Sequence, residues 1–344
     1  MIRSLVLLGV AALAVLPTFA DDKKDPPKKK ERIAINEPTK LKDDADFAIQ
    51  GEYEGIVLGD SAKVGAHVVA MGEGKFNVKV YRGGLPGAGW DTKIAAITGK
   101  GTRTGDDARA DLVGKETALT GTINMGTKGM IFTANYGDEK MAFSKVERKS
   151  KTIGEKPPEG AVVLFGKEGD EANWNGGKIV EISDGKYLNV GVKSKQAFGA
   201  FKAHVEFRLP WMPNSTGQGR ANSGVYLQDR YELQVLDSFG LAGENNECGG
   251  IYTQHKPIVN MCYPPMLWQT YDIEFAPAQF DDSGKKTKNG RTTIYHNGVK
   301  IHDDVELPKE CPGGEKENAK PGVFQFQNHG DPVVYRNVWV VEKK

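Results

Sequence analysis

The segment from Asn222 to Ser238, NSGVYLQDRYELQVLDS, constrains the fold more than any other part of the chain. Its apolar residues lie two positions apart, which is the spacing of strands that bury one face: Val225, Leu227, Leu233 and Val235. Glu232 and Gln234 share the opposite face of the second strand. Polar side chains on a sheet face, rather than at a turn, indicate a surface that holds a hydrogen-bonding ligand. We expect that ligand to be a carbohydrate.

The rest of the chain also favours a mainly β fold. There are 42 glycines and 17 prolines among 344 residues, and few long helical patterns. Apolar and polar residues alternate in residues 201–208, 271–275 and 323–327, and Asn297-Gly298 has the composition of a tight hairpin turn. Many antiparallel strands joined by turns predict a sandwich in which one face of a sheet is solvated.

The length predicts two domains, by a prior of roughly 150 residues each. A boundary is expected in residues 151–160, KTIGEKPPEG, because two adjacent prolines oppose both helix and ladder pairing. Residues 46–150, with short strands punctuated by glycine, are predicted to form a small accessory β domain. Residues 159–344 are predicted to form the larger domain.

The first residues predict export. Residues 1–20 have the pattern of a signal peptide, in which Arg3 precedes an apolar run and Thr18-Phe19-Ala20 ends it. The apolar run is shorter than the roughly 20 residues that span a bilayer. We expect a periplasmic or secreted protein with no membrane span and no lipid anchor. Residues 21–45, which begin DDKKDPPKKKER, are predicted to be a disordered basic linker.

Charge and cysteine content exclude several classes of function. A formal net charge of +1 gives no electrostatic case for binding nucleic acid or anionic membranes. Cys248 and Cys262 are close enough in sequence to form a disulfide, which would leave Cys311 over. None of the three lies in a CxxC motif or beside a histidine, so zinc binding and thiol catalysis are not expected.

Six sequence blocks in residues 207–340 resemble one known family. In chain order they are FRLP, GRANSGVYLQDRYELQVLDSFG, NECGGIY, PPMLWQTYDIEF, HNGV and FQNHGDPVVYRNVWV. Together they resemble the 3-keto-disaccharide hydrolase family, which is similar to the concanavalin-like lectins and glucanases. The resemblance implies a jelly-roll sandwich with a concave, sugar-facing sheet over residues 159–344. It also implies that the small β domain is an accessory region.

Ordinary glycoside hydrolysis needs two carboxylates, and retaining glucanases of this general fold place them about 5 Å apart on one strand face. Here the face that carries Glu232 continues through Gln234 to Leu236, and Asp237 has the opposite parity unless a bulge intervenes. The strand therefore lacks the carboxylate pair. The 3-keto sugar implied by the resemblance does not need it, because its C3 carbonyl acidifies the C2 hydrogen and the aglycone can leave by elimination, followed by hydration.

Such a site needs a base, a group that stabilises the enolate oxygen and a proton donor for the leaving group. Glu232, His329 and Arg336 supply these chemical types. We expect Glu232 or His329 to be the base, Arg336 or a bound cation to stabilise the enolate, and all three to gather around one cavity. The residues expected to bind substrate are Glu206, Asn222, Gln234, Asp237, Gln327 and Trp268.

Each of these side chains also has a purely structural interpretation. Glu232 could pair with Arg230, Arg208 or Arg336 as a structural ion pair. His329 could cap a turn, Asp237 could serve a turn, Arg336 could be a strut for Glu232, and Trp268 could pack in the core.

Two other functions fit the same sequence pattern. A lectin-like domain would bind carbohydrate without cleaving it. A conventional hydrolase would use Glu232 with Glu206, if their strands are neighbours. No HExxH or EF-hand motif is present, and the metal is left unassigned, although Glu232, Asp237 and His329 could converge on a divalent cation.

Overall fold

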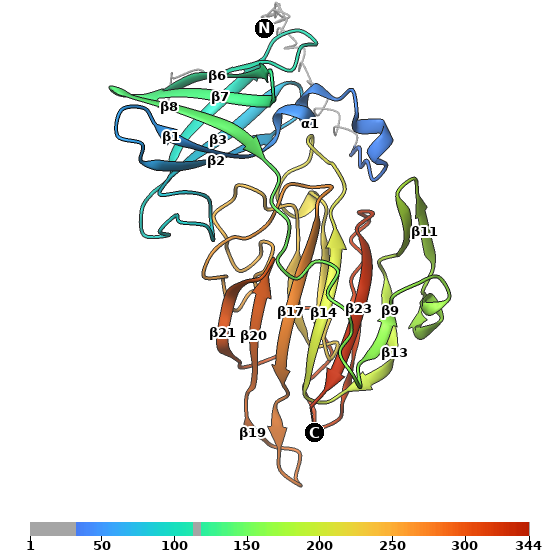
Figure 1. The fold of residues 1–344 in the computed structure, drawn as a ribbon. Helices are drawn as coiled ribbons and strands as arrows, with labels where there is room; N and C mark the ends of the chain where they lie inside the picture. Colours follow the sequence, from blue (N-terminus) through green and yellow to red (C-terminus); the bar gives the residue numbers. More distant parts are fainter. Residues whose placement is uncertain (1–31, 113–117, 344) are drawn as a thin grey trace, which may run out of the picture. The chain divides into compact units, whose positions relative to one another are not determined.

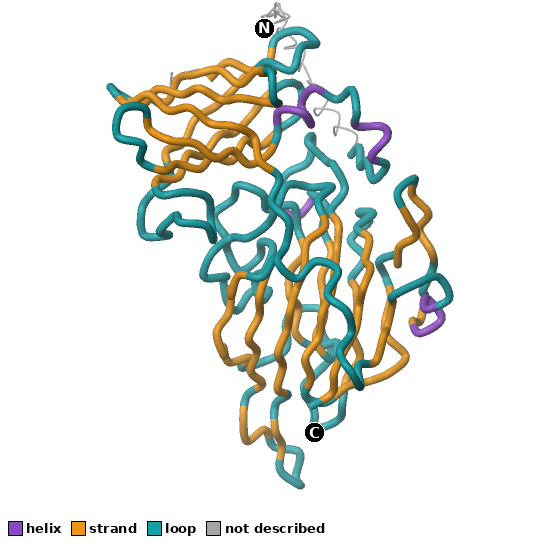
Figure 2. The backbone as a smooth tube through the Cα atoms, in the orientation of Figure 1, coloured by secondary structure: helices purple, strands orange, loops and turns teal. Residues whose placement is uncertain are grey.

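The computed structural model describes residues 32–112 and 118–343, and its regular secondary structure is almost entirely β-strand. A closed barrel of eight strands comes first, and a sandwich of a five-stranded and an eight-stranded sheet follows (Figure 1). The few helices are short, as the colouring in Figure 2 makes plain. The predicted fold class, a β sandwich preceded by a smaller β part, is confirmed.

The barrel is antiparallel throughout, and β8 closes it by pairing with β1. Alternation decides which side chains fill it: in β7, Met130, Phe132 and Ala134 are buried and their neighbours are exposed. A 3-10 helix, Pro38–Leu41, and the short helix α1, Ala45–Ile49, precede it. The barrel strands are β1 Gly51–Val57, β2 Lys63–Ala70, β3 Lys75–Arg82, β4 Ile97–Arg103, β5 Ala110–Leu112, β6 Leu119–Gly126, β7 Gly129–Tyr136 and β8 Glu139–Val146.

The five-stranded sheet has the strand order β10-β13-β22-β15-β16. Its strands are β10 Trp174–Asn175, β13 Val192–Phe198, β22 Gly322–Phe326, β15 Ser223–Leu227 and β16 Tyr231–Val235. Two 3-10 helices, Asp170–Asn173 and Gly217–Gly219, lie in the connections. The predicted strands of residues 222–238 are therefore β15 and β16, and they pair with Tyr226 opposite Glu232.

The eight-stranded sheet has the order β11-β12-β23-β14-β17-β20-β21, and β9 pairs with β23. Figure 1 shows β20, β17, β14 and β23 side by side. Its strands are β9 Val162–Phe165, β11 Ile179–Ile182, β12 Gly185–Leu188, β14 Phe201–Arg208, β17 Trp268–Ala276, β20 Gly290–His296, β21 Val299–Leu307 and β23 Val334–Glu342. A separate ribbon joins β18 Gln279–Phe280 to β19 Lys286–Lys288.

The core lies between the two sheets, so each sheet has an inner face that packs in the core and an outer face that points away from it. Val225 and Leu233 of the five-stranded sheet are fully buried in it, and Phe326 stacks on Tyr335 of the eight-stranded sheet with ring centroids 3.9 Å apart. Residues of the other parity point away from the core. Glu232 therefore lies on the outer face of one sheet, and Glu206 lies on the outer face of the other. The two outer faces are on opposite sides of the sandwich.

Residues 32–45 are ordered, which corrects the prediction of a disordered linker through residue 45. Ile35 and Trp211 exchange backbone hydrogen bonds of 3.0 and 2.8 Å, and the Trp211 indole donates to Asp44 at 3.0 Å. These contacts gave no periodic signal in the sequence. The predicted signal peptide, residues 1–20, and residues 21–31 of the predicted linker lie outside the described residues.

The three cysteines are buried free thiols, so the possible Cys248–Cys262 disulfide is not formed. The Cys248 sulfur instead lies 3.2 Å from the Tyr271 hydroxyl. Over the described ranges, no helix is long and apolar enough to cross a membrane.

Candidate functional site

Glu232 is a buried carboxyl group on the outer face of the five-stranded sheet, with 2% of its surface exposed. Its hydrogen-bond partner is the Tyr226 hydroxyl, which donates to Oε2 at 2.9 Å from the facing strand. Gly224 lies beside this carboxyl: a Cβ added at position 224 would stand 2.5 Å from Glu232 Oε1. A side chain at position 224 would therefore force the Glu232 carboxyl to shift.

No cation within the described residues pairs with Glu232, which rules out the structural ion pair considered above. Arg230 donates to Gln228 and Asn318 instead. Arg208 binds Asp184, and Arg336 binds Glu206. Because burial disfavours the charged form, the pKa of Glu232 rises to about 7, although the Tyr226 hydrogen bond opposes the rise. A carboxyl group with this pKa can both accept and return a proton at neutral pH.

Amide side chains surround this carboxyl on the same face. Gln327 donates from Nε2 to the Tyr226 hydroxyl at 3.1 Å. Asn222 donates to the Gln218 carbonyl at 2.9 Å, and Gln234 donates to Gln218 Oε1 at 3.3 Å. The predicted binders Asn222, Gln234 and Gln327 thus share the outer face of the five-stranded sheet with Glu232. This group of side chains, together with Tyr226 and Gln218, is called the Glu232 surface.

Two acceptors in this cluster have no hydrogen-bond partner, although both atoms are buried: Asn222 Oδ1 and Gln327 Oε1. A buried polar atom without a partner is costly, and native proteins usually satisfy it with water or a ligand. Both atoms are acceptors, so the missing partner must donate hydrogen bonds. Hydroxyl groups of a sugar have this property.

Tyr226 and Gln218 belong to this surface and were missed in the sequence. Tyr226 has the parity of Asn222 and Gly224 on β15, so its outward direction could have been deduced from the alternation. Gln218 lies in a 3-10 turn, Gly217–Gly219, where no periodic pattern reveals the direction of a side chain.

Asp237 and His329 lie away from the hydrogen bonds of this surface. Asp237 binds Arg220 at 2.5 Å and also accepts from the Phe239 amide at 3.3 Å, which agrees with the alternative turn role rather than with substrate binding beside Glu232. His329 is exposed in the loop after β22, and its turn is closed by Asn328, which accepts from the Gly330 amide at 2.8 Å. The alternative in which His329 caps this turn is therefore not seen, and its expected catalytic role stays a prediction.

Arg336, Glu206 and Trp268 lie on the outer face of the opposite sheet, which corrects three predictions at once. Arg336 donates to Glu206 Oε2 at 2.7 Å, and its guanidinium carbon stands 3.9 Å from the centroid of the Trp268 ring. The expectation that Arg336 meets Glu232 in one cavity is wrong. Arg336 has a structural role, because it holds the carboxylate of Glu206 in place rather than that of Glu232. Glu206 is likewise no partner for Glu232, because β14 pairs with β17 and β23, whereas β16 pairs with β15.

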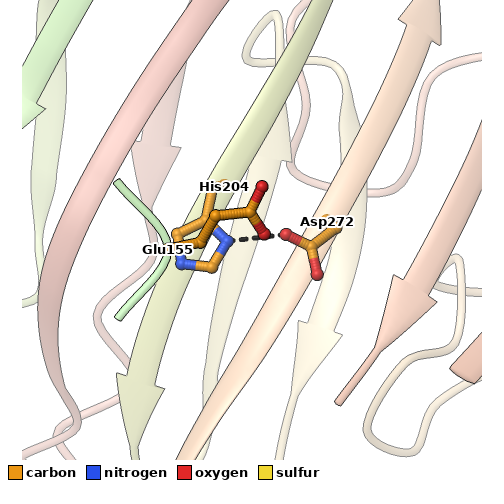
Figure 3. A group of neighbouring side chains, drawn as sticks. All are labelled: Glu155, His204 and Asp272. Carbon is orange, nitrogen blue, oxygen red and sulfur yellow. Dashed lines mark hydrogen bonds and ion pairs between the residues drawn. The ribbon is translucent and has the colours of Figure 1, made fainter. Parts of the chain in front are cut away.

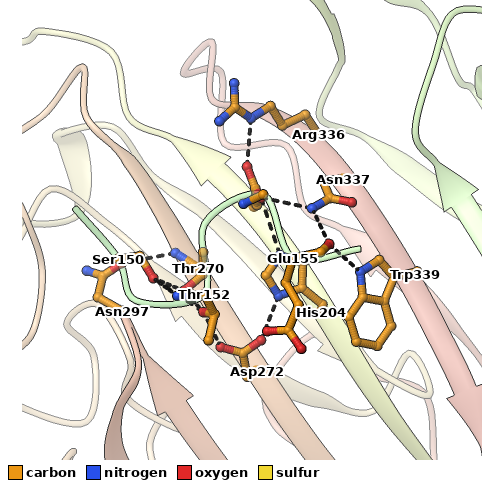
Figure 4. A network of polar contacts seen from close by, with 12 residues as sticks. Ser150, Thr152, Glu155, His204, Thr270, Asp272, Asn297, Arg336, Asn337 and Trp339 are labelled. Atoms are coloured by element: carbon orange, nitrogen blue, oxygen red, sulfur yellow. Dashed lines mark hydrogen bonds and ion pairs between the residues drawn. The ribbon is translucent and has the colours of Figure 1, made fainter. Parts of the chain in front are cut away.

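Glu206 is the centre of a buried polar network on that face. Figure 4 labels its partners His204, Arg336 and Asn337. Besides the bond from Arg336, Glu206 accepts hydrogen bonds from the Gly154 amide at 2.6 Å and Asn337 at 2.9 Å, and His204 Nε2 lies 3.4 Å away. Burial would raise the pKa of Glu206, but these partners lower it to about 2. Hydrogen bonds that join Ser150, Thr152 and Gly154 to residues of the sheet hold the segment of residues 150–155 against it.

His204 connects this network to Asp272, whose Oδ1 lies 2.6 Å from Nδ1 (Figure 3). Burial disfavours the charged ring, but the hydrogen bonds to Asp272 and Glu206 prevail and raise the pKa of His204 to about 9. Asp272 also accepts from Thr152 at 2.6 Å. His204 is therefore a charged link between two carboxylates.

One group of side chains within the described part has the spacing of a metal site: potential ligand atoms of Glu155, His204 and Asp272 lie within 4.8 Å of one another (Figure 3). Both ring nitrogens of His204 already face carboxylates. The ion-pair network thus accounts for the group without a metal. The convergence of Glu232, Asp237 and His329 on a cation is not seen, because Asp237 binds Arg220 and Glu232 binds Tyr226.

The charge on His204 predicts a pH-dependent stability. Its pKa is about 9 in the folded protein and about 6.5 in an unfolded chain, so its contribution is complete below about pH 6.5 and is lost as the pH rises to about 9. The difference in unfolding free energy between the wild type and His204→Asn should therefore be larger at pH 6 than at pH 9.5 in urea titrations. His329→Asn, on an exposed loop, is the control and should show no such trend. A difference for His204→Asn that is equal at both pH values would contradict the assignment.

Comparison with known proteins places the sandwich in a family. Residues 160–341 match the model of the 3-keto-alpha-glucoside-1,2-lyase-like domain. No curated protein matches the chain.

Three solved structures of candidate glycosyl hydrolases from Parabacteroides distasonis are similar to it. The first is 28% identical, with 54% of this chain and 85% of that chain covered and a TM-score of 0.46. The second is 19% identical, with 53% and 99% covered and a TM-score of 0.37. The third is 16% identical, with 56% and 93% covered and a TM-score of 0.34.

The matched residues run from just before β9 almost to the end of β23, so they include both sheets and the whole Glu232 surface. Over more than half of its length, the chain belongs to the family of 3-keto-alpha-glucoside-1,2-lyase-like domains.

Proposed function

We propose that the protein cleaves 3-ketoglycosides, such as 3-keto-disaccharides, with Glu232 as the group that transfers the proton. One observation carries the proposal: Glu232 is buried without a cation, beside two buried acceptors that lack hydrogen-bond donors. The raised pKa suits proton transfer at neutral pH, and the acceptors suit a polyhydroxylated ligand. The family to which the sandwich belongs supports the choice of a keto sugar.

In the proposed reaction, the Glu232 carboxylate removes the proton from C2 of the keto sugar. The electron pair of the C2–H bond forms the C1=C2 double bond, and the C1–O bond to the aglycone breaks. Glu232 then returns its proton to the departing aglycone oxygen. Water adds to the enone, with its hydroxyl on C1 and its proton on C2, which gives the free 3-keto sugar.

Hydrogen-bond donors near Glu232 would stabilise the negative oxygen that develops at C3. Tyr226 and Gln327 are the donors that lie closest to the carboxyl in the hydrogen-bond network. They take the role first expected of Arg336, which is bound to Glu206 on the opposite face. His329 remains a second proton-transfer candidate, because its exposed loop directly follows Gln327 and Asn328.

The decisive experiment compares an oxidised with an unoxidised disaccharide. We expect the purified protein to release product from the 3-keto disaccharide and none from the plain sugar. Elimination should also exchange the C2 hydrogen with solvent, which is measured by mass spectrometry in deuterated water. Cleavage of the plain sugar, or release without exchange, would contradict the mechanism.

Binding of both sugars without cleavage of either would favour the lectin-like alternative. We further propose that the protein acts after export, in the periplasm or outside the cell, on the basis of the signal pattern in residues 1–20.

A further inference from the structure

A cavity whose lining does not include Glu232 has a volume of 410 Å³. It is lined by β3 and β4 on one side and by loop residues 216–220 and 237–241 on the other. These segments all belong to the one compact unit of residues 32–344. The ring of His67 packs 4.5 Å from that of Phe239, and Arg220 donates to the Ala70 carbonyl at 3.1 Å, so several contacts hold the two sides together.

Arg220 supplies the cavity with a donor that has no partner. The side chain is 4% exposed, and its Nε binds Asp237 while its Nη1 binds the Ala70 and Ser215 carbonyls. Its Nη2 is buried and bonded to nothing in the described structure. A buried guanidinium nitrogen without an acceptor is costly, so an acceptor from outside the chain would be stabilising.

Lys79 adds a second cation to the same lining. It is half-buried, and no ion pair or hydrogen bond joins its ammonium group to the described residues. Burial lowers the pKa of Lys79. Among the described residues, the acidic group that opposes this is Glu247, whose carboxylate accepts from the Gly243 and Glu244 amides. Removing a lysine from water without a counter-charge is unfavourable, and an anion would offset that cost.

Lys100 and Asp237 also line the cavity, and the remaining wall is largely apolar. Val69, Val78, Phe239 and Leu241 contribute to this apolar part. The unsatisfied groups are thus the reverse of those beside Glu232, where acceptors lack donors. A neutral, hydroxyl-rich sugar fits the Glu232 surface, whereas this cavity fits an anion with an apolar body.

We propose that this cavity binds a small carboxylate that carries an apolar ring, with its carboxylate bound by Arg220 Nη2 and the Lys79 ammonium group. The ring contacts the apolar walls, and two charge-assisted hydrogen bonds orient the carboxylate. The site goes beyond the proposed cleavage reaction and does not depend on it.

Calorimetric titration of the whole protein with benzoate at neutral pH and low salt tests the proposal. We expect benzoate to bind with one-to-one stoichiometry and at least about 10-fold more tightly than benzamide, because one charge-assisted hydrogen bond contributes about that factor. Inorganic phosphate should not displace it. Lys79→Met should weaken benzoate binding by about 10-fold or more and leave cleavage at Glu232 unchanged. Lys79 is chosen over Arg220 because Arg220 also holds Asp237.

Lys75→Met is the matched control, because it removes the same charge from the same face of β3 outside the cavity. Its ammonium group is 3.4 Å from Glu73 on the surface. This variant should bind benzoate like the wild type. Equal affinity for benzoate and benzamide, competition by phosphate, unchanged binding by Lys79→Met, or no binding at millimolar benzoate would each overturn the proposal.

Discussion

Glu232→Gln should lower the rate of 3-ketoglycoside cleavage by about 10²- to 10⁴-fold, which is the usual contribution of a positioned general acid or base. Glutamine has nearly the same shape and can keep the Tyr226 contact, so the variant should remain folded. It cannot accept a proton from C2 at neutral pH. Single-turnover release of the aglycone measures the loss, and thermal unfolding verifies the fold.

The pH profile gives this prediction a second, independent readout. Glu232 must be ionised to act as a base, so kcat/KM should rise with pH and level off above about pH 7, where its pKa lies. Glu274→Gln is the control for charge removal, since Glu274 is half-exposed on the outer face of the opposite sheet and pairs with Lys202 and Lys343. Its activity should equal that of the wild type. A Glu232→Gln variant that retains more than about a tenth of the activity would refute the assignment of Glu232.

Glu206→Ala should destabilise the protein by about 3–5 kcal/mol, the usual cost of removing one partner from a buried ion pair. Arg336, Asn337 and the Gly154 amide would lose their common acceptor, and His204 would lose one of its two carboxylates. Denaturation in guanidinium chloride measures this loss. At temperatures where the variant is folded, its cleavage rate should equal that of the wild type.

Glu274→Ala tests whether burial causes the effect. This residue lies on the neighbouring strand of the same sheet, and both of its ion pairs are solvent-exposed, so we expect a loss below about 1 kcal/mol. A similarly small loss for Glu206→Ala would show that the network contributes little. A large loss of kcat in folded Glu206→Ala would contradict the assignment of the reaction to the Glu232 face of the sandwich.

The sequence predicted the strands well because alternation directly reports burial. Val225, Leu227, Leu233 and Val235 lie in the core as their spacing indicated, and Glu232 and Gln234 point away from it together. The order of residues 32–45 was not predicted, because backbone pairing of Ile35 with Trp211 depends on a distant partner and leaves no local pattern.

The candidate site was only partly predictable, because alternation gives the face of a strand but not the sheet that the strand joins. Arg336 was expected near Glu232, yet β23 pairs with β14 in the opposite sheet. The pairing shifts register between His204 and Glu206, and Asn337 adopts a φ of +43° there. Such a bulge reorients the neighbouring side chains and cannot be deduced from residue spacing.

Gly224 has a consequence for how this fold could change its activity during evolution. A single methyl group at this position would displace the acidic side chain that lies over it, yet the surrounding amides could stay in place. If Glu232 transfers the proton as proposed, alanine at this position should slow the reaction more than it weakens sugar binding. Under the proposed function, loss of this one glycine would turn a catalyst into a receptor that binds the sugar without cleaving it.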